Sequence, residues 1–90
     1  MNTTVFFNEI KKVVNCTLES TFAYSVNPDK YFYEIILHSE PTEEVKEMCE
    51  KNGFSIKKNI LHVNDGDDMV AHTIWEVRPT DNNDIEYVEA

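Results

Sequence analysis

The stretch HVNDGDD, residues 62–68, places three aspartates around a glycine, close after a histidine. Carboxylates at alternating positions are the ligands of a calcium loop, which also needs a glycine at its sixth position. Counted from Asp65, Asp67 falls third and Glu76 twelfth, but apolar residues occupy the fifth and sixth positions. Since the ligand set and the sharp turn are both missing, the sequence does not predict a calcium site.

The same stretch matches a β-hairpin turn. Asp65-Gly66 is a favoured two-residue turn, and apolar residues alternate on both sides of it. We therefore predict a hairpin with Asp65-Gly66 at its tip. This turn does not by itself require the next two aspartates, Asp67 and Asp68, which remain candidates for contact with another molecule.

Histidine and cysteine are the other residue types that could bind a metal or act as a nucleophile and base. His62 and His72 are expected on the two strands of the hairpin, near each other if its register is symmetric, but zinc needs further ligands. Cys16 and Cys49 have no partner at C-x-x-C or H-x-x-x-H spacing. Cys49 is expected on a buried helix face, which raises the pKa of a thiol and shields it. The sequence therefore predicts two reduced thiols, no metal, no cofactor and no enzymatic activity.

Negative charge is the clearest pattern in the chain, whose formal net charge is −9. Residues 1–38 hold four acidic and three basic side chains, whereas residues 39–90 hold thirteen and five. An acidic chain is a poor candidate for direct binding to nucleic acid or to an anionic membrane, because binding there requires basic side chains. A basic protein partner is favoured instead.

The acidic residues of the second half fall on one face of a helix, at the hairpin tip and in the C-terminal segment. Tyr87, and Trp75 with it, could supply an aromatic anchor beside them. The candidate partner-binding residues are Glu43, Glu47, Glu50, Asp65, Asp67, Asp68, Asp81, Asp84, Glu86, Tyr87 and Glu89. The alternative explanation of this charge is a surface that only keeps the protein in solution.

Hydrophobic periodicity predicts one α+β domain over residues 1–79, followed by an acidic C-terminal tail, residues 80–90. The expected elements are a helix over 4–16, strands over 20–26 and 31–38, a helix capped by Ser39 or Thr42 and ended by Asn52-Gly53, and strands over 54–63 and 69–77. Four antiparallel strands should form one sheet, with both helices on one face and the other face at least partly open.

The expected core consists of the apolar residues on the inward faces of these elements. It comprises Phe6, Ile10, Val14, Phe22, Tyr24, Ile35, Leu37, Val45, Met48, Phe54, Ile74 and Trp75. A register shift of one residue would turn a whole strand face outward. The tail is expected to be mobile, with the alternative that its alternating stretch DIEYVE, residues 84–89, adds an edge strand.

Two hypotheses on function follow. The first is a stoichiometric inhibitor that blocks a basic nucleic-acid-binding protein or nuclease, whose phosphate-binding groove its carboxylates would occupy. By size and charge the chain resembles phage anti-defence proteins such as anti-CRISPRs, antitoxins and nuclease immunity proteins. The alternative is a small domain that self-associates as a homodimer through an exposed sheet face or edge, such as the strand over 20–26. Without a signal peptide or a membrane-spanning stretch, a cytoplasmic location is expected.

Overall fold

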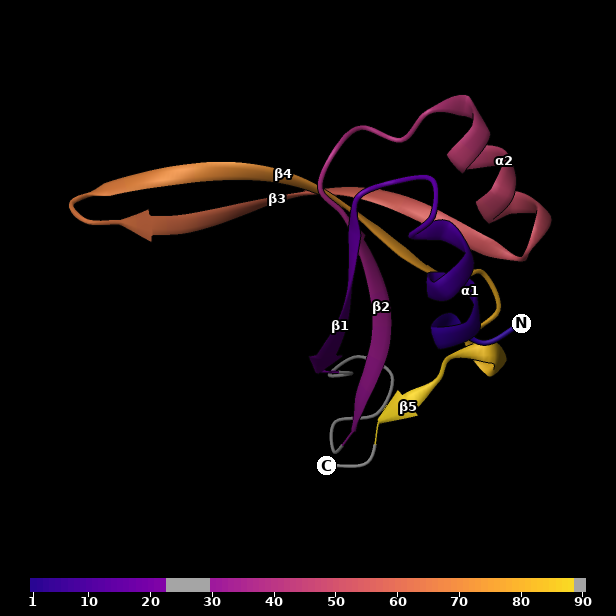
Figure 1. The fold of residues 1–90 in the computed structure, drawn as a ribbon. Coiled ribbons are helices and arrows are strands. Elements are labelled where there is room, and N and C mark those ends of the chain that lie inside the picture. The colour runs from indigo at the N-terminus through magenta and orange to yellow at the C-terminus, as the bar shows by residue number, and fades with distance from the viewer. Residues whose placement is uncertain (23–29, 89–90) are drawn as a thin grey trace.

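The computed structural model describes residues 1–22 and 30–88. The elements are α1 (Thr3–Ile10), β1 (Cys16–Phe22), β2 (Tyr31–Leu37), α2 (Glu43–Lys51), β3 (Phe54–Asp65), β4 (Asp68–Pro79), a short 3-10 helix η1 (Asn82–Asp84) and β5 (Tyr87–Val88) (Figure 1). Two helices and a five-stranded antiparallel sheet confirm the predicted α+β class and add one strand to the predicted four.

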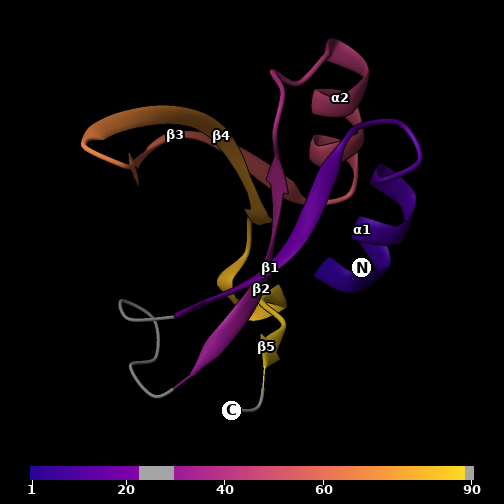
Figure 2. The same cartoon turned by 60° about the vertical axis from the view of Figure 1, so that its left-hand side comes forward.

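The sheet has the order β1-β2-β4-β3, and β5 pairs with β2. β2 is the central strand: it pairs with β1 along its whole length on one side. On its other side it pairs with β4 at residues 35–37 and with β5 at residues 31–32. Both helices lie against the same face of this sheet, and no element of the described residues covers the opposite face (Figures 1 and 2). We call this second surface the open face.

The core lies between the two helices and the sheet. Its fully enclosed residues are Phe6, Ile10, Ile35, Leu37, Val45, Cys49, Phe54 and Val77. The rings of Phe6 and Phe54 stack with their centroids 4.3 Å apart, which joins α1 to the start of β3. Most of the predicted core is confirmed, including Ile74, which is buried on the open face.

Four predicted core residues are less buried than predicted, and a fifth cannot be assigned. Val14, Met48 and Trp75 are only partly buried at the edge of the core. Phe22 is 45% exposed at the end of β1, and Tyr24 lies outside the described residues.

The first helix is shorter than predicted. α1 begins after Asn2, whose side chain accepts a hydrogen bond of 2.8 Å from the backbone N–H of Val5, and ends at Ile10. A turn follows, and β1 starts at Cys16, which pairs with Leu37. Cys16 is therefore a strand residue and not a helical one. The apolar residues after Ile10 continued the helical pattern, but pairing with β2 decides the conformation from Cys16 onwards.

The second helix follows the predicted signals closely. Thr42 is the N-cap and its hydroxyl accepts a hydrogen bond from the N–H of Val45 at 3.3 Å. Glu43 and Glu44 lie in the first turn, where negative charge stabilises a helix. Gly53, with φ of 79°, ends the helix in the left-handed conformation that glycine adopts without strain.

β3 and β4 form a long hairpin whose outer half extends beyond the rest of the molecule (Figure 1). We call residues 57–73 the arm, because every one of them is exposed. The predicted sheet had both helices on one face of its four strands, but no helix or further strand of the described chain covers either face of the arm. The loop is Gly66-Asp67 and not Asp65-Gly66, since Asp65 pairs with Asp68 and Gly66 has φ of 68°.

The C-terminal segment joins the sheet. Tyr87 pairs with Phe32, and the backbone N–H of Tyr33 donates to the carbonyl of Glu86 at 3.0 Å. The Glu86 carboxylate accepts hydrogen bonds from the N–H and the hydroxyl of Thr4, at 3.0 and 2.8 Å, in the first turn of α1. Of the two alternatives for this segment, the structure therefore has the edge strand.

Candidate functional site

The open face contains a concavity of about 450 Å³ in the angle between the base of the arm and strands β1 and β2. Three carboxylates line it, those of Glu19, Glu34 and Glu76, beside an apolar surface formed by Ile36, Leu61 and Ile74. These side chains meet because Glu19 lies opposite Glu34, and Ile36 lies opposite Glu76, in the paired strands. We call this feature the acidic concavity.

Glu34 is the buried member of the three, with its side chain 5% exposed. One carboxylate oxygen accepts the hydroxyl of Thr21 at 2.5 Å, and the other accepts Nε of Arg78 at 2.7 Å. Arg78 also donates from Nη2 to Glu76 at 2.7 Å and lies over the ring of Phe32. A buried carboxylate needs such partners, because removing a charge from water is costly.

This ion-pair network affects the protonation of its only cation. Burial by itself lowers the pKa of the Arg78 guanidinium. The hydrogen bond and charge of Glu34, joined by those of Glu76, outweigh burial and raise that pKa above its ordinary value. Arg78 therefore stays charged and holds the two carboxylates together.

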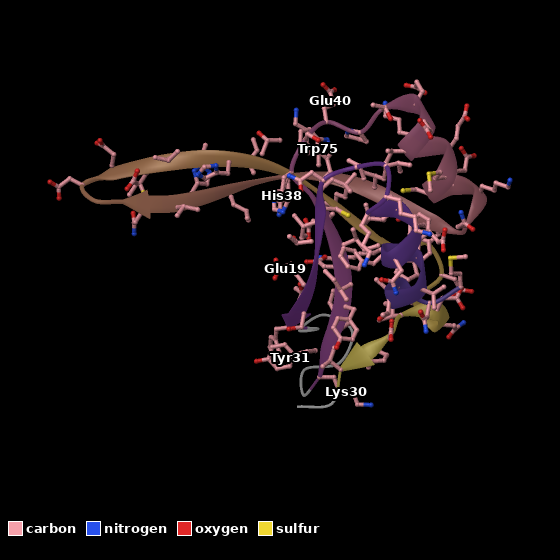
Figure 3. The ribbon with its side chains drawn as sticks, viewed as in Figure 1. Glu19, Lys30, Tyr31, His38, Glu40 and Trp75 are labelled. Atoms are coloured by element: carbon pink, nitrogen blue, oxygen red, sulfur yellow. The ribbon has the colours of Figure 1, made fainter. Side chains whose placement is uncertain are left out.

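The network leaves the acidic concavity with excess negative charge. Glu19 is exposed and directly opposite Glu34, an arrangement of like charges that destabilises a pair of strands. In the described chain Arg78 forms ion pairs with Glu34 and Glu76 but not with Glu19. Glu19 projects from the side of the sheet away from the helices, as does His38, whose Nε2 shares a hydrogen bond of 3.0 Å with Thr17 (Figure 3). The site can therefore accept a further cation.

The predicted acidic groups do not gather on one surface. On α2, Glu43, Glu47 and Glu50 are exposed, and Glu43 pairs with Lys46 at 3.3 Å. The three aspartates lie at the tip of the arm, far from α2 (Figure 1). Each group is exposed, but the two lie at separate ends of the molecule (Figure 1).

The C-terminal candidates divide further. Asp81 caps η1 by accepting the N–H of Asn83 at 2.9 Å, and Asp84 is exposed. Glu86 binds Thr4, as described above, so its carboxylate holds the fold together. Tyr87 is 38% exposed, with Nζ of Lys30 5.3 Å from its ring centre. Glu89 lies outside the described residues.

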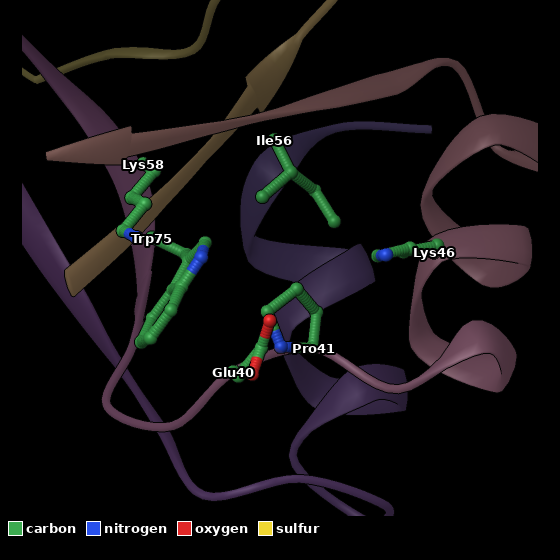
Figure 4. A pocket seen from close by; sticks show the side chains of 6 residues that line it. All are labelled: Glu40, Pro41, Lys46, Ile56, Lys58 and Trp75. Carbon is green, nitrogen blue, oxygen red and sulfur yellow. The ribbon is translucent and has the colours of Figure 1, made fainter. Parts of the chain in front are cut away.

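A second cavity, of about 300 Å³, lies at the base of the arm on the helix side (Figure 4). Trp75, Ile56 and Pro41 form its apolar walls, and the side chains of Lys46, Lys58 and Glu40 surround it. Trp75 is therefore not an anchor among the predicted acidic residues. It lies beside two lysines, a setting that does not favour a basic group.

The thiols and histidines do not form a metal-binding cluster in the part of the chain that the structure describes. Burial raises the pKa of the Cys49 thiol to about 11, in line with its predicted place on the buried helix face. Burial also raises the pKa of the Cys16 thiol, although the charge of Lys11 acts in the opposite direction. His62 lies opposite Ala71, so His62 and His72 project from opposite faces of the arm, contrary to a symmetric register. Among residues 1–22 and 30–88, no three His, Cys, Asp or Glu side chains could hold a metal ion together.

One feature of the sequence points to the acidic concavity. Glu34 interrupts the apolar stretch YFYEIIL, and a charge inside a central strand requires a partner of opposite sign. Arg78 is the only arginine of the chain. Pairing these two residues would have placed Glu76 and the base of the arm beside β2.

Comparisons with protein-family models, with curated proteins and with solved structures found no match to this chain. Neither helix in the described residues has the length and apolar character needed to cross a membrane.

Proposed function

We propose that this protein binds a basic, nucleic-acid-binding protein or nuclease and blocks it, and that the acidic concavity receives an arginine or lysine of that partner. The observation that carries the proposal is the set of three carboxylates that line one concavity, of which only Glu34 and Glu76 pair with an arginine of the chain. A guanidinium from the partner would meet the exposed Glu19 and relieve its repulsion with Glu34.

The apolar part of the acidic concavity supports a protein partner over a free cation. Ile36, Leu61 and Ile74 can pack against the aliphatic stem of an arginine or lysine while its charged end reaches the carboxylates. Shape and apolar contact supply binding energy that charge alone does not give.

The net charge of −9 supports a role in steering. Carboxylates on α2 and at the tip of the arm lie outside the acidic concavity, and we propose that they raise the association rate with a basic surface. An arginine held by these carboxylates is no longer free to bind phosphate, which is how the protein would block nucleic-acid binding. Anti-defence proteins, antitoxins and immunity proteins that act in the cytoplasm are the classes this mechanism fits.

Glu19→Lys is the sharpest test, because Glu19 is exposed and no hydrogen bond or ion pair of the described chain involves its carboxylate. The partner is first captured on the immobilised protein and purified. Isothermal titration calorimetry then measures the Kd of the complex, which we expect Glu19→Lys to raise roughly tenfold or more. Glu9→Lys makes the same charge change at an exposed residue of α1, where Glu9 forms only a surface ion pair with Lys12, and should alter the Kd by less than about threefold.

Two further measurements separate the roles of the acidic groups. Reversing Asp65, Asp67 and Asp68, or Glu43, Glu47 and Glu50, to lysine should slow association more than it speeds dissociation. One equivalent of the wild-type protein should abolish binding of the partner to DNA or RNA. A partner that binds Glu19→Lys as tightly as wild type, or that still binds nucleic acid in the complex, would refute the proposal.

A further inference from the structure

The outer edge of β3 is unpaired along the whole arm. Within the described residues β3 pairs only with β4, in an uninterrupted register from Phe54 to Asp65. Proteins commonly protect such an edge with proline, a bulge or charges along its length. This edge has no proline and no bulge, and its charged residues lie only at its two ends, Lys57 and Lys58 at the base and Asp65 at the tip.

The hairpin register fixes which backbone groups point outward. The closing pair of a two-residue hairpin, here Asp65 with Asp68, bonds across the hairpin, and the pattern alternates from there. The outward N–H and C=O groups therefore belong to Lys58, Ile60, His62 and Asn64. In agreement, the N–H of Ile60 donates to the side chain of Asn59 at 2.9 Å and not to β4.

We propose that two copies of this chain pair through these edges, antiparallel and centred on Leu61, to form a four-stranded ribbon from two arms. In this register Ile60 bonds with His62 of the second copy, and Lys58 bonds with Asn64. Leu61 lies on the two-fold axis, opposite Leu61 of the second copy. All four outward residues then have a backbone partner.

Complementary charges on β3 favour a second copy of the chain as the partner, and they favour this register. Lys57 lies opposite Asp65 of the second copy, and the symmetry makes this pair twice. Within one copy, Asp65 faces Asp68 across the hairpin, and like charges in that position destabilise the strands. Lys57 forms no ion pair in the described chain, although it lies opposite Glu76. Each group therefore gains a partner that one copy does not provide.

Exposed apolar side chains in the middle of the arm support the same arrangement. Ile60, Leu61 and Val63 are 51%, 43% and 46% exposed. Pairing places Leu61 beside its own copy, and brings Ile60 and Val63 next to the neighbouring strand. Two-stranded ribbons are marginally stable alone, and three or more strands are needed for independent stability. A second arm supplies those strands.

Sedimentation equilibrium of the full chain tests the proposal, with a dimer expected at micromolar to millimolar concentration. Lys57→Asp should weaken the dimer roughly tenfold, because two attractive pairs become repulsive. Lys58→Asp is the matched control: it makes the same charge change on the neighbouring residue, which faces Asn64 of the second copy, and should change the dimer constant by less than about threefold. Lys57→Asp combined with Asp65→Lys should restore dimerisation.

Ile60→Pro provides a second, independent variant. It removes an outward N–H and leaves the bonds between β3 and β4 in place, so the arm should fold but not dimerise. Amide exchange would show this directly: the N–H groups of Ile60 and His62 should be protected only in the dimer, while those of Leu61 and Val63 are protected in both states. A chain that stays monomeric at millimolar concentration would overturn the proposal. So would a dimer that neither Lys57→Asp nor Ile60→Pro weakens.

The dimer and the proposed partner binding share Leu61 and Asp65, but Glu19 distinguishes them. Glu19 lies on β1 and not on the β3 edge, so Glu19→Lys should leave the dimer constant unchanged.

Discussion

Phe6→Ala should lower the free energy of unfolding by about 3–5 kcal/mol, the cost typical of removing a buried aromatic ring. Phe6 is fully buried and stacks on Phe54, so its ring joins α1 to the beginning of β3. The cavity left behind lies among Ile10, Ile35 and Val77, which are held by both the helices and the sheet and cannot close it fully. Urea denaturation followed by circular dichroism measures the change.

Val5→Ala is the control on the same helix. Val5 is 48% exposed, so its truncation should cost less than about 1 kcal/mol. A Phe6→Ala cost as small as that of Val5→Ala would contradict the position of α1 against the sheet.

Arg78→Met should lower the free energy of unfolding by about 2–3 kcal/mol. The substitution leaves the buried carboxylate of Glu34 without its counter-ion, and an uncompensated buried charge is strongly destabilising. The cost falls below that of a fully buried pair because the side chain of Arg78 is 42% exposed. Chemical denaturation at neutral pH measures it.

Two variants separate charge from packing at this position. Glu34→Gln in the Arg78→Met background should recover about 1 kcal/mol, because the buried charge is gone while the hydroxyl of Thr21 keeps an acceptor. Arg78→Lys should be intermediate, since lysine keeps the charge but cannot bridge two carboxylates with fixed donors. Equal stability of Arg78→Met and the double variant would mean that burial of the Glu34 charge costs little.

Local signals predicted the parts of the fold that depend on neighbouring residues. The helix over residues 43–51 has a capping threonine, acidic residues in its first turn and a glycine after its end, and each of these acts within one turn of chain. The hairpin was predicted for the same reason, with its loop displaced by one residue. These features need no knowledge of distant contacts.

The remaining features depend on pairing between distant segments. Helix periodicity continued through Val14, but Cys16 instead starts β1 because Leu37 lies opposite it. The arm was predicted as two strands of a sheet with helices on one face, yet no element of the described chain covers either face of the arm. Periodicity cannot show which elements reach a strand. The acidic concavity combines β1, β2 and β4, so its carboxylates share a surface only once the strand order is known.

The acidic candidate residues also show that position in the sequence does not determine position in the fold. Glu86 belongs to the acidic C-terminal segment in sequence, but in space its carboxylate binds the first turn of α1. Glu19 stands alone in the sequence, and cross-strand pairing makes it the exposed carboxylate of the concavity. Charge counted along the chain predicted an acidic surface, whereas the strand register determines which acids act together.

An NMR titration of the isotopically labelled protein with an oligo-arginine peptide at low salt tests the proposal that the acidic concavity receives an arginine. We expect the backbone amides of Glu19, Ile36, Ile74 and Glu76 to shift first and most. We also expect these shifts to shrink strongly in Glu19→Lys and as ionic strength screens the charges. Shifts confined to α2 and the tip of the arm, with the acidic concavity unaffected and Glu19→Lys behaving as wild type, would contradict it.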